Sequence, residues 1–214
     1  MVAHAFLIVR NMKIICIGMN YGPHIREMGH DFPEKPVFFL KPDTAIIQRN
    51  RPFFLPEFSQ NVQYELEMIV RICKVGKCIQ PKFASTYYSE IGLGIDFTAR
   101  DIQKECIAHG YPWEIAKGFD GSAPISNFVP VSNYKNIQDI NFSLLLNGKE
   151  VQHGNTSQMV FSVNDIICHV SEYYTLKMGD ILFTGTPQGV GQVRIGDHLQ
   201  AYLEDKCLLD FYVR

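Results

Sequence analysis

The strongest constraint on the fold lies at residues 64–70, Tyr-Glu-Leu-Glu-Met-Ile-Val, where apolar and acidic side chains alternate. Successive side chains of a β-strand point to opposite faces, so this segment predicts a strand that carries Glu65 and Glu67 on the same face. Two carboxylates on one face fit a solvent-facing strand, since alternating strands commonly have one polar face. They also fit a site for a hard divalent cation such as Mg2+ or Mn2+, which prefers oxygen ligands. Taken alone, the pattern favours the solvent-facing strand.

Length and composition predict one globular domain that spans residues 1–214. The 214 residues are 46% hydrophobic and 20% charged, which is ordinary for a globular protein with a sizeable core. The formal net charge is −2, and lysine and arginine form no run. This charge distribution argues against electrostatic binding of nucleic acid.

The cysteines and the N-terminal residues predict a cytoplasmic protein. The cysteines form no Cys-x-x-Cys pair and lie mostly among apolar neighbours, as expected of reduced core residues. They are Cys16, Cys73, Cys78, Cys106, Cys168 and Cys207. Residues 1–9 are apolar, but they carry no basic leader and no small-residue cleavage site, and they are too short to span a bilayer. We therefore expect neither export nor insertion into a membrane.

A histidine and a glutamate follow the first apolar run, residues 13–18, which predicts a buried strand. Pro23 suits the start of a short helix and Gly29 suits its end. On that helix His24 and Glu27 are three residues apart and share a face. The carboxylate could orient the imidazole as a general base that acts on water. The alternative, an exposed polar pair on a surface helix, is the more common meaning of such a pair by itself.

A third carboxylate, Asp96, follows the apolar segment 91–95, which contains Gly92 and Gly94. Glycine weakens a strand unless another group approaches its backbone closely. The third glycine of a dinucleotide-binding fingerprint is missing, so this segment does not predict a nucleotide site. Residues 101–106 predict a helix. Lys117, further on among apolar residues, fits either a ligand for a substrate carboxylate or a surface lysine that buries only its aliphatic stem.

The second half of the chain, from residue 140, predicts mainly strands and one helix. Asn147-Gly148 marks a β-hairpin over residues 142–152, and residues 162–165 form a capping box ahead of apolar side chains at helical spacing. A strand at 180–184 leads into the glycine-rich loop 185–191, which lacks the Gly-Lys-Ser/Thr of a phosphate-binding loop. The loop is either a tight turn or, through its amides and the Thr186 hydroxyl, a cradle for a carboxylate.

In the first half, residues 74–77 resemble a hairpin turn.

Taken together, these segments resemble the fumarylacetoacetate hydrolase superfamily from about residue 13 to the C-terminus. Six motifs occur in the family's order: Gly-Met-Asn-Tyr with His24 and Glu27, then residues 64–67, 96–103, 113–120, 151–156 and 179–187. Gly-Tyr-Pro-Trp ahead of Lys117 is most similar to the small single-domain acylpyruvate hydrolases and oxaloacetate decarboxylases. Two positions depart from the family pattern, and both could alter substrate choice. Met19 stands where many relatives carry arginine, and Gly-Ser-Ala-Pro at 121–124 replaces the commoner Asp-Thr/Ser-Gly-Pro.

The resemblance implies a β-rich α+β fold, a mixed β-roll with a few short helices, and a homodimer. It implies that one Mg2+ or Mn2+ ion per subunit is held by three carboxylates, those of Glu65, Glu67 and Asp96. It also implies catalytic roles for His24 and Glu27, which would activate water, and for Lys117. Contacts to the substrate would come from Arg100, Gln103 and Thr186.

The activity implied by the resemblance is hydrolysis of the carbon–carbon bond in acylpyruvate-like 1,3-diketo acids. The metal would stabilise the enolate that forms when the bond breaks. The second hypothesis is an oxaloacetate decarboxylase or keto-acid isomerase, which uses the same enolate without an attacking water. A third is a non-catalytic relative that binds a metal or a ligand. On either enzymatic hypothesis the partner is a small keto acid.

Overall fold

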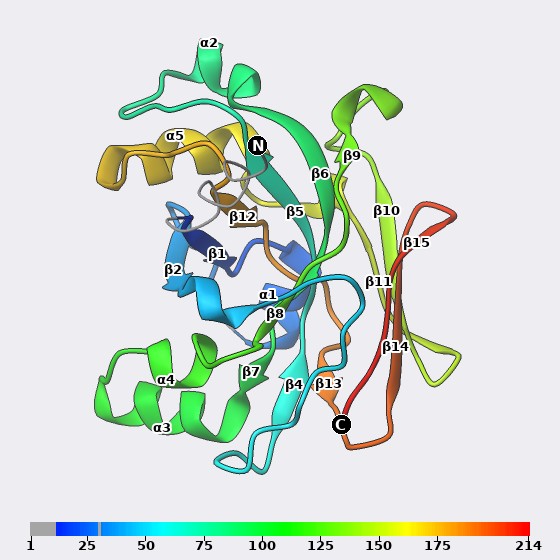
Figure 1. Cartoon of the computed structure of the whole chain (residues 1–214). Coiled ribbons are helices and arrows are strands. Elements are labelled where there is room, and N and C mark those ends of the chain that lie inside the picture. Colours follow the sequence, from blue (N-terminus) through cyan, green and yellow to red (C-terminus); the bar gives the residue numbers. More distant parts are fainter. Residues whose placement is uncertain (1–11, 30) are drawn as a thin grey trace, which may run out of the picture.

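A six-stranded mixed sheet lies at the centre of the molecule (Figure 1), which is described by a computed structural model at residues 12–29 and 31–214. The prediction for residues 1–9 therefore falls outside the described residues. The strand order is β2-β1-β12-β5-β6-β9, with β1 and β12 parallel and the other neighbours antiparallel. The strands are β1 (Ile14–Gly18), β2 (Val37–Lys41), β5 (Leu66–Ile72), β6 (Tyr88–Ile95), β9 (Val129–Pro130) and β12 (Ile181–Phe183).

A four-stranded antiparallel sheet packs against this central sheet and closes the core on one side (Figure 1). Its order is β11-β10-β14-β15, formed by β10 (Asn141–Leu146), β11 (Lys149–Asn155), β14 (His198–Leu203) and β15 (Lys206–Tyr212). Asn147 and Gly148 connect β10 to β11 with φ angles of 53° and 79°, as a two-residue hairpin turn requires. The hairpin prediction is confirmed.

Two small sheets and short helices complete the structure. One sheet joins β13 (Gly191–Gln192), β4 (Val62–Tyr64) and β7 (Thr98–Ala99), and the other joins β3 (Ile46–Ile47) and β8 (Ala123–Pro124). The helices are α1 (Gly22–Glu27), α2 (Pro81–Ala84), α3 (Arg100–His109), α4 (Glu114–Lys117) and α5 (Val163–Tyr173). Single 3-10 turns occur at Asp43–Ala45, Ser85–Tyr87, Val131–Asn133 and Thr156–Gln158. The predicted class, strand-rich α+β with a few short helices, is confirmed.

Helix α5 follows the predicted capping box. The Ser162 hydroxyl accepts a hydrogen bond from the Asp165 amide at 3.2 Å, and the Asp165 carboxylate accepts one from the Ser162 amide at 2.9 Å. Ile166, Ile167 and Val170 face the core, as their helical spacing predicts. No helix in the described part of the chain is long and apolar enough to cross a membrane. The six cysteines, all of them among the described residues, form no disulfide.

The predicted hairpin turn at residues 74–77 is wrong. Strands β5 and β6 are antiparallel neighbours, but a longer segment that includes α2 connects them. Gly76 instead exchanges backbone hydrogen bonds with Leu176, which follows α5. The turn-like composition of this segment therefore reflects a bend that is held by a distant part of the chain.

Candidate metal centre

Three carboxylates from two neighbouring strands meet beneath one pocket. Glu67 lies on β5, Glu65 lies between β4 and β5, and Asp96 follows β6. The pairing of Glu67 with Gly94, and the hydrogen bond of 2.8 Å from the Asp96 amide to the Glu65 carbonyl, bring the ends of these strands together. Oxygen atoms of the three carboxylates all lie within 4.8 Å of one another, and the residues are only 6%, 2% and 1% exposed. The solvent-facing alternative for the strand is therefore wrong.

Gly94 shows why glycine stands in this strand. A Cβ atom at this position would lie 2.6 Å from the ring of Phe183 on β12. The aromatic ring therefore packs directly onto the backbone of β6, as the sequence argument requires of a glycine inside a strand. This close contact holds the strand opposite Glu67 in a fixed position.

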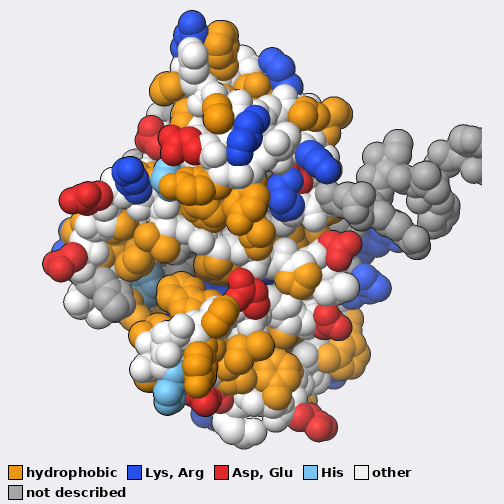
Figure 2. All heavy atoms as spheres, turned by 90° about the vertical axis from the view of Figure 1, so that its left-hand side faces the viewer, with side chains coloured by type: hydrophobic (Ala, Val, Ile, Leu, Met, Phe, Trp, Pro, Cys, Tyr) orange, Lys and Arg blue, Asp and Glu red, His pale blue; other side chains and the backbone are white. Residues whose placement is uncertain are grey.

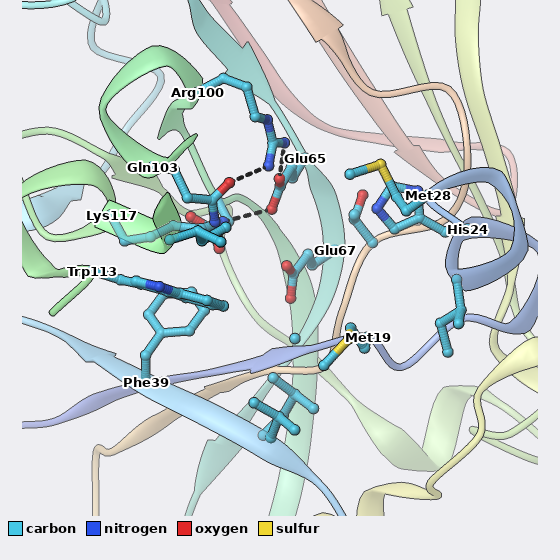
Figure 3. A pocket seen from close by; sticks show the side chains of 17 residues that line it. Met19, His24, Met28, Phe39, Glu65, Glu67, Arg100, Gln103, Trp113 and Lys117 are labelled. Carbon is cyan, nitrogen blue, oxygen red and sulfur yellow. Dashed lines mark hydrogen bonds and ion pairs between the residues drawn. The ribbon is translucent and has the colours of Figure 1, made fainter. Parts of the chain in front are cut away.

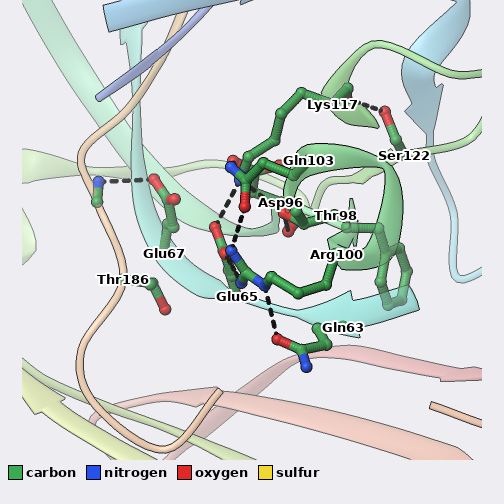
Figure 4. Close-up of polar contacts among 12 residues, drawn as sticks. Gln63, Glu65, Glu67, Asp96, Thr98, Arg100, Gln103, Lys117, Ser122 and Thr186 are labelled. Atoms are coloured by element: carbon green, nitrogen blue, oxygen red, sulfur yellow. Dashed lines mark hydrogen bonds and ion pairs between the residues drawn. The ribbon is translucent and has the colours of Figure 1, made fainter. Parts of the chain in front are cut away.

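Lys117 is buried between two of the carboxylates (Figure 4). Its Nζ donates hydrogen bonds to Glu65 Oε2 at 2.8 Å, Asp96 Oδ2 at 2.9 Å and Thr98 Oγ1 at 2.6 Å. Burial alone would lower the pKa of Lys117, but the carboxylates of Asp96 and Glu65 raise it above its usual value. The ammonium is therefore charged, and the surface-lysine alternative is wrong.

Arg100, at the start of α3, holds Glu65 from the other side. Its guanidinium forms an ion pair with Glu65 Oε1 and donates to Gln63 Oε1 at 2.8 Å and to Gln103 Oε1 at 2.5 Å. Burial would raise the pKa of Glu65, but Lys117 and Arg100 together lower it to about 2. Glu65 therefore stays ionised at any ordinary pH.

Glu67 has the opposite electrostatic environment. Burial and the neighbouring carboxylates of Asp96 and Glu65 raise its pKa well above 4.5. Its Oε2 accepts one hydrogen bond from the Gly185 amide, at 2.6 Å. Gly185 has φ +99°, and a Cβ atom there would lie 2.8 Å from Asn20 Cβ, so only glycine fits this close approach.

These carboxylates fit a divalent cation. Asp96 Oδ1 is buried and receives no hydrogen bond from the described residues, although Lys41 Nζ forms an ion pair with it at 2.8 Å. A carboxylate oxygen has two lone pairs, so Lys41 alone leaves one of them unoccupied. A cation beside Asp96, Glu65 and Glu67 would occupy it and would lower the pKa of Glu67. Three carboxylates are the hard oxygen ligands that Mg2+ and Mn2+ favour.

Lys41 supports the site and is not among the site residues predicted from the sequence. It ends β2 and is 2% exposed. Its Nζ donates to the carbonyl oxygens of Lys117 at 2.5 Å, Ser122 at 3.0 Å and Phe97 at 3.2 Å. These bonds tie the end of α4 to the segment after Asp96. The sequence signal for a buried role was a lysine at the end of an apolar strand. Its partners could not be read from the sequence because they lie far away along the chain.

His24 and Glu27 form the predicted pair on α1. His24 Nδ1 lies 3.1 Å from Glu27 Oε2, and the two side chains are 14% and 46% exposed. His24 lines the same pocket as the three carboxylates, across Glu67 from Lys117 (Figure 3). Glu27 lies behind the imidazole at the surface. A proton on Nδ1, shared with Glu27, leaves the lone pair of Nε2 available as a base.

Thr186 and Gln103 also line the pocket. The Thr186 hydroxyl accepts a hydrogen bond of 2.9 Å from Gln152 Nε2. Gln152, which lies on β11 within the matching motif at 151–156, also accepts from the Leu66 amide at 2.9 Å. Gln152 is not among the site residues predicted from the sequence. In the structure it connects the Thr186 loop to the strand that carries Glu67.

The pocket lies on the face where hydrophobic side chains gather around a hollow (Figure 2). The polar side chains that line it are His24, Glu65, Glu67, Asp96, Arg100, Gln103, Lys117 and Thr186. The remaining side chains of the wall are apolar and include Met19, Met28, Phe39 and Trp113 (Figure 3). All the predicted site residues except Glu27 therefore line one pocket, and Glu27 contacts a residue that does.

Comparisons with known proteins identify the family of the chain. The family model described as fumarylacetoacetate (FAA) hydrolase C-terminal matches residues 13–213. The chain is 40% identical over 201 residues to the mitochondrial oxaloacetate tautomerase FAHD1 of Bos taurus, covering 94% of this chain and 91% of that protein. It is 38% identical to the oxaloacetate tautomerase YcgM of Escherichia coli K12, covering 92% and 90%.

A solved structure carries a metal in a similar fold. Fumarylpyruvate hydrolase from Pseudomonas aeruginosa, in complex with Mn2+ and pyruvate, superposes with a TM-score of 0.90 at 33% identity. The superposition covers 98% of this chain and 93% of that one.

Proposed function

Because the chain belongs to the fumarylacetoacetate hydrolase family, we propose that it is a Mg2+- or Mn2+-dependent enzyme that hydrolyses the carbon–carbon bond of acylpyruvate-like 1,3-diketo acids. The observation that carries the proposal is the buried group of three carboxylates in the same pocket as His24, whose imidazole is paired with Glu27. The similarity to a fumarylpyruvate hydrolase that binds Mn2+ and pyruvate supports it. Pyruvate is the product that an acylpyruvate hydrolase would release.

The charges of the site suit a keto acid. Glu65, Glu67 and Asp96 contribute three negative charges, which Lys41, Arg100 and Lys117 match with three positive ones. A divalent cation held by the carboxylates would leave two positive charges in excess. An acylpyruvate that is being cleaved carries one carboxylate and develops one enolate oxygen, so its charge would match that excess.

The metal, when bound by Glu65, Glu67 and Asp96, would supply a Lewis acid that stabilises developing negative charge on oxygen, an effect worth several kcal/mol. His24 would accept a proton at Nε2 from water as the water attacks the distal carbonyl carbon. A general base of this kind contributes roughly 10^2 to 10^4 in rate. Glu27 would stabilise the imidazolium that forms.

The cations and amides on the other wall would bind the keto-acid end of the substrate. The Lys117 ammonium would neutralise developing oxyanion charge. Arg100, Gln103 and Thr186 would orient the carboxylate. The bond between the C3 methylene and C4, the distal carbonyl carbon, then breaks. The acyl part leaves as a carboxylic acid, and the other fragment is protonated at C3 to give pyruvate. His24, which holds the proton taken from water, would return it.

A second candidate is tautomerisation or decarboxylation of oxaloacetate. The observation that favours it is the similarity, at 40% and 38% identity, to two proteins named oxaloacetate tautomerase. These reactions need the same stabilised enolate but no attacking water. His24 and Lys117 would then move a proton between carbon and oxygen, and Glu27 would matter less.

A steady-state screen tests the proposal and separates the candidates. Acetylpyruvate, fumarylpyruvate and oxaloacetate are each supplied with Mg2+, with Mn2+ and with EDTA. We expect pyruvate and the free acid from at least one of the two acylpyruvates with either metal, and no turnover with EDTA. Turnover of oxaloacetate alone would replace the leading proposal with the second candidate. No turnover of any substrate with either metal would leave a non-catalytic binding protein.

A further inference from the structure

We propose that the apolar wall of the pocket binds the acyl tail of the substrate, so that this protein selects acylpyruvates whose tail is an apolar chain without a second carboxylate. The inference rests on the proposed function and adds the class of substrate. The wall, called the tail site below, consists of Met19, Met28, Val37, Phe39, Ile107 and Trp113. In Figure 3, Phe39 and Trp113 lie on the side of Lys117, Met19 lies below Glu67, and Met28 lies beside His24.

The tail site is open to solvent although it is apolar. Met28 is 44% exposed, Val37 is 36% exposed and Ile107 is 59% exposed. Apolar side chains that gather at the mouth of a pocket commonly mark a surface that a ligand covers. Covering them with an apolar tail would remove this surface from water. Each methylene that becomes buried strengthens binding by about fourfold.

The positive groups of the pocket do not reach the tail site. Among the described residues that line the pocket, the lysines and arginines are Arg100 and Lys117. Both are hydrogen-bonded to the carboxylates and amides of the polar wall, through Glu65 and Gln103 for Arg100 and through Glu65 and Asp96 for Lys117. A carboxylate at the far end of an acyl chain would therefore lie against apolar side chains without a cation, which is unfavourable.

Phe39 marks the boundary between the two walls. Lys117 Nζ lies 5.1 Å from the centre of its ring, so one side of Phe39 faces the charged group. Trp113 packs against Phe39 with ring centres 6.2 Å apart and planes inclined by 60°. On the other side of Glu67 from these rings, Met19 and Met28 supply flexible thioether side chains that can adapt to tails of different shape. A substrate that crosses this boundary has its keto-acid end beside Lys117 and its tail among apolar groups.

Met19 is the residue on which selection depends most. It directly follows β1 and lines the pocket below Glu67 in the view of Figure 3. An arginine at this position would place a guanidinium on the apolar wall and would give a terminal carboxylate a partner. Met19→Arg should therefore change the preferred tail, whereas Met19→Leu should preserve it.

Calorimetry with two keto acids of matched shape tests the inference without requiring turnover. The ligands are 7-methyl-2-oxooctanoate, whose chain ends in an isopropyl group, and 2-oxoheptanedioate, whose chain ends in a carboxylate of the same shape. Both lack the carbonyl group that hydrolysis attacks. With the Mg2+-loaded full chain, we expect the apolar ligand to bind at least about tenfold more tightly. Met19→Arg should reduce that ratio at least about tenfold, and Met19→Leu should leave it unchanged. Val37→Lys, at the exposed edge of the tail site, is a second variant that should shift the ratio in the same direction.

Equal or tighter binding of the dicarboxylate to the natural chain would overturn the inference. So would an unchanged ratio in folded Met19→Arg and Val37→Lys proteins. Hydrolysis is measured in parallel with the corresponding 2,4-dioxo acids. A binding preference without any hydrolysis would refute the proposed function but would support the tail site. Hydrolysis of both acids at equal rates, with equal affinities, would support the proposed function but would refute the tail site.

Discussion

Replacing Lys117 with methionine is the perturbation whose outcome the structure specifies most closely. The substitution keeps the length of the side chain but removes an ammonium that is 3% exposed and donates to Glu65, Asp96 and Thr98. Removing one partner of a buried ion pair costs about 3–5 kcal/mol, because the other charge stays buried. Arg100 and Lys41 remain beside the two carboxylates, so we expect the lower end of that range. In a domain of this size, 3 kcal/mol corresponds to a fall of about 6–12 °C in Tm.

The metal should partly reverse this loss. Without the ammonium, two cations remain beside the three carboxylates, which should therefore attract a divalent cation more strongly. We expect saturating Mg2+ to raise the Tm of Lys117→Met by more than it raises the Tm of the natural protein. The assay is thermal unfolding followed by circular dichroism, with EDTA and with Mg2+. Lys206→Met, at an exposed position at the start of β15, is the matched control.

Two results would refute the reasoning. If Lys117→Met and Lys206→Met unfold at the same temperature with EDTA, Lys117 is not the buried partner of the carboxylates. If Mg2+ raises the Tm of both proteins equally, the ammonium and the cation do not act on the same group of charges.

Three further predictions concern the base, the proton on Glu67 and the backbone at Gly185. Glu27→Gln should lower the hydrolysis of acylpyruvates by roughly 10^2 to 10^4 while the affinity for Mg2+, measured by calorimetry, stays the same; normal hydrolysis would exclude the pair with His24. The raised pKa of Glu67 means that the folded metal-free protein holds this proton more tightly than the unfolded chain does, so its contribution to stability is complete below pH 4.5 and is lost as pH rises through the raised value. The gain in Tm on adding Mg2+ should therefore increase with pH above 4.5, and a gain independent of pH would contradict this. Gly185→Ala should lower the free energy of unfolding by about 1–3 kcal/mol and should weaken metal binding, because the amide that bonds Glu67 must shift. The control is Gly196→Ala, which has a similar φ of +96° and no atoms within 4 Å of the added Cβ, and it should leave metal binding unchanged.

Much of the local structure could be predicted from the sequence because its signals are local. The Asn147-Gly148 hairpin and the capping box at Ser162 each depend on residues within a few positions of one another, and both are present. The alternation at residues 64–70 likewise showed that Glu65 and Glu67 share a face. It could not show whether that face meets water.

The environment of the site could not be predicted from local patterns because it depends on distant partners. Glu65 is buried because Lys117 and Arg100 neutralise it, and these cations lie 35 or more positions along the chain. Glu67 accepts its hydrogen bond from the Gly185 amide, which lies 118 positions away. The family resemblance brought these residues together, but it did not include Lys41 or Gln152. Lys41 donates to Phe97, which is 56 positions away, and Gln152 accepts from Leu66, which is 86 positions away. The wrong turn at 74–77 has the same cause, because Leu176 holds that segment.

Titration of Mn2+ into the metal-free protein, followed by calorimetry, tests the central claim most directly. We expect one site per chain, and an affinity that falls at least about tenfold in Glu65→Gln, Glu67→Gln and Asp96→Asn. Glu57→Gln, at an exposed carboxylate outside the pocket, should bind as the natural protein does. A natural protein that binds no Mn2+, or three variants that bind it as tightly as the Glu57→Gln control, would contradict the account.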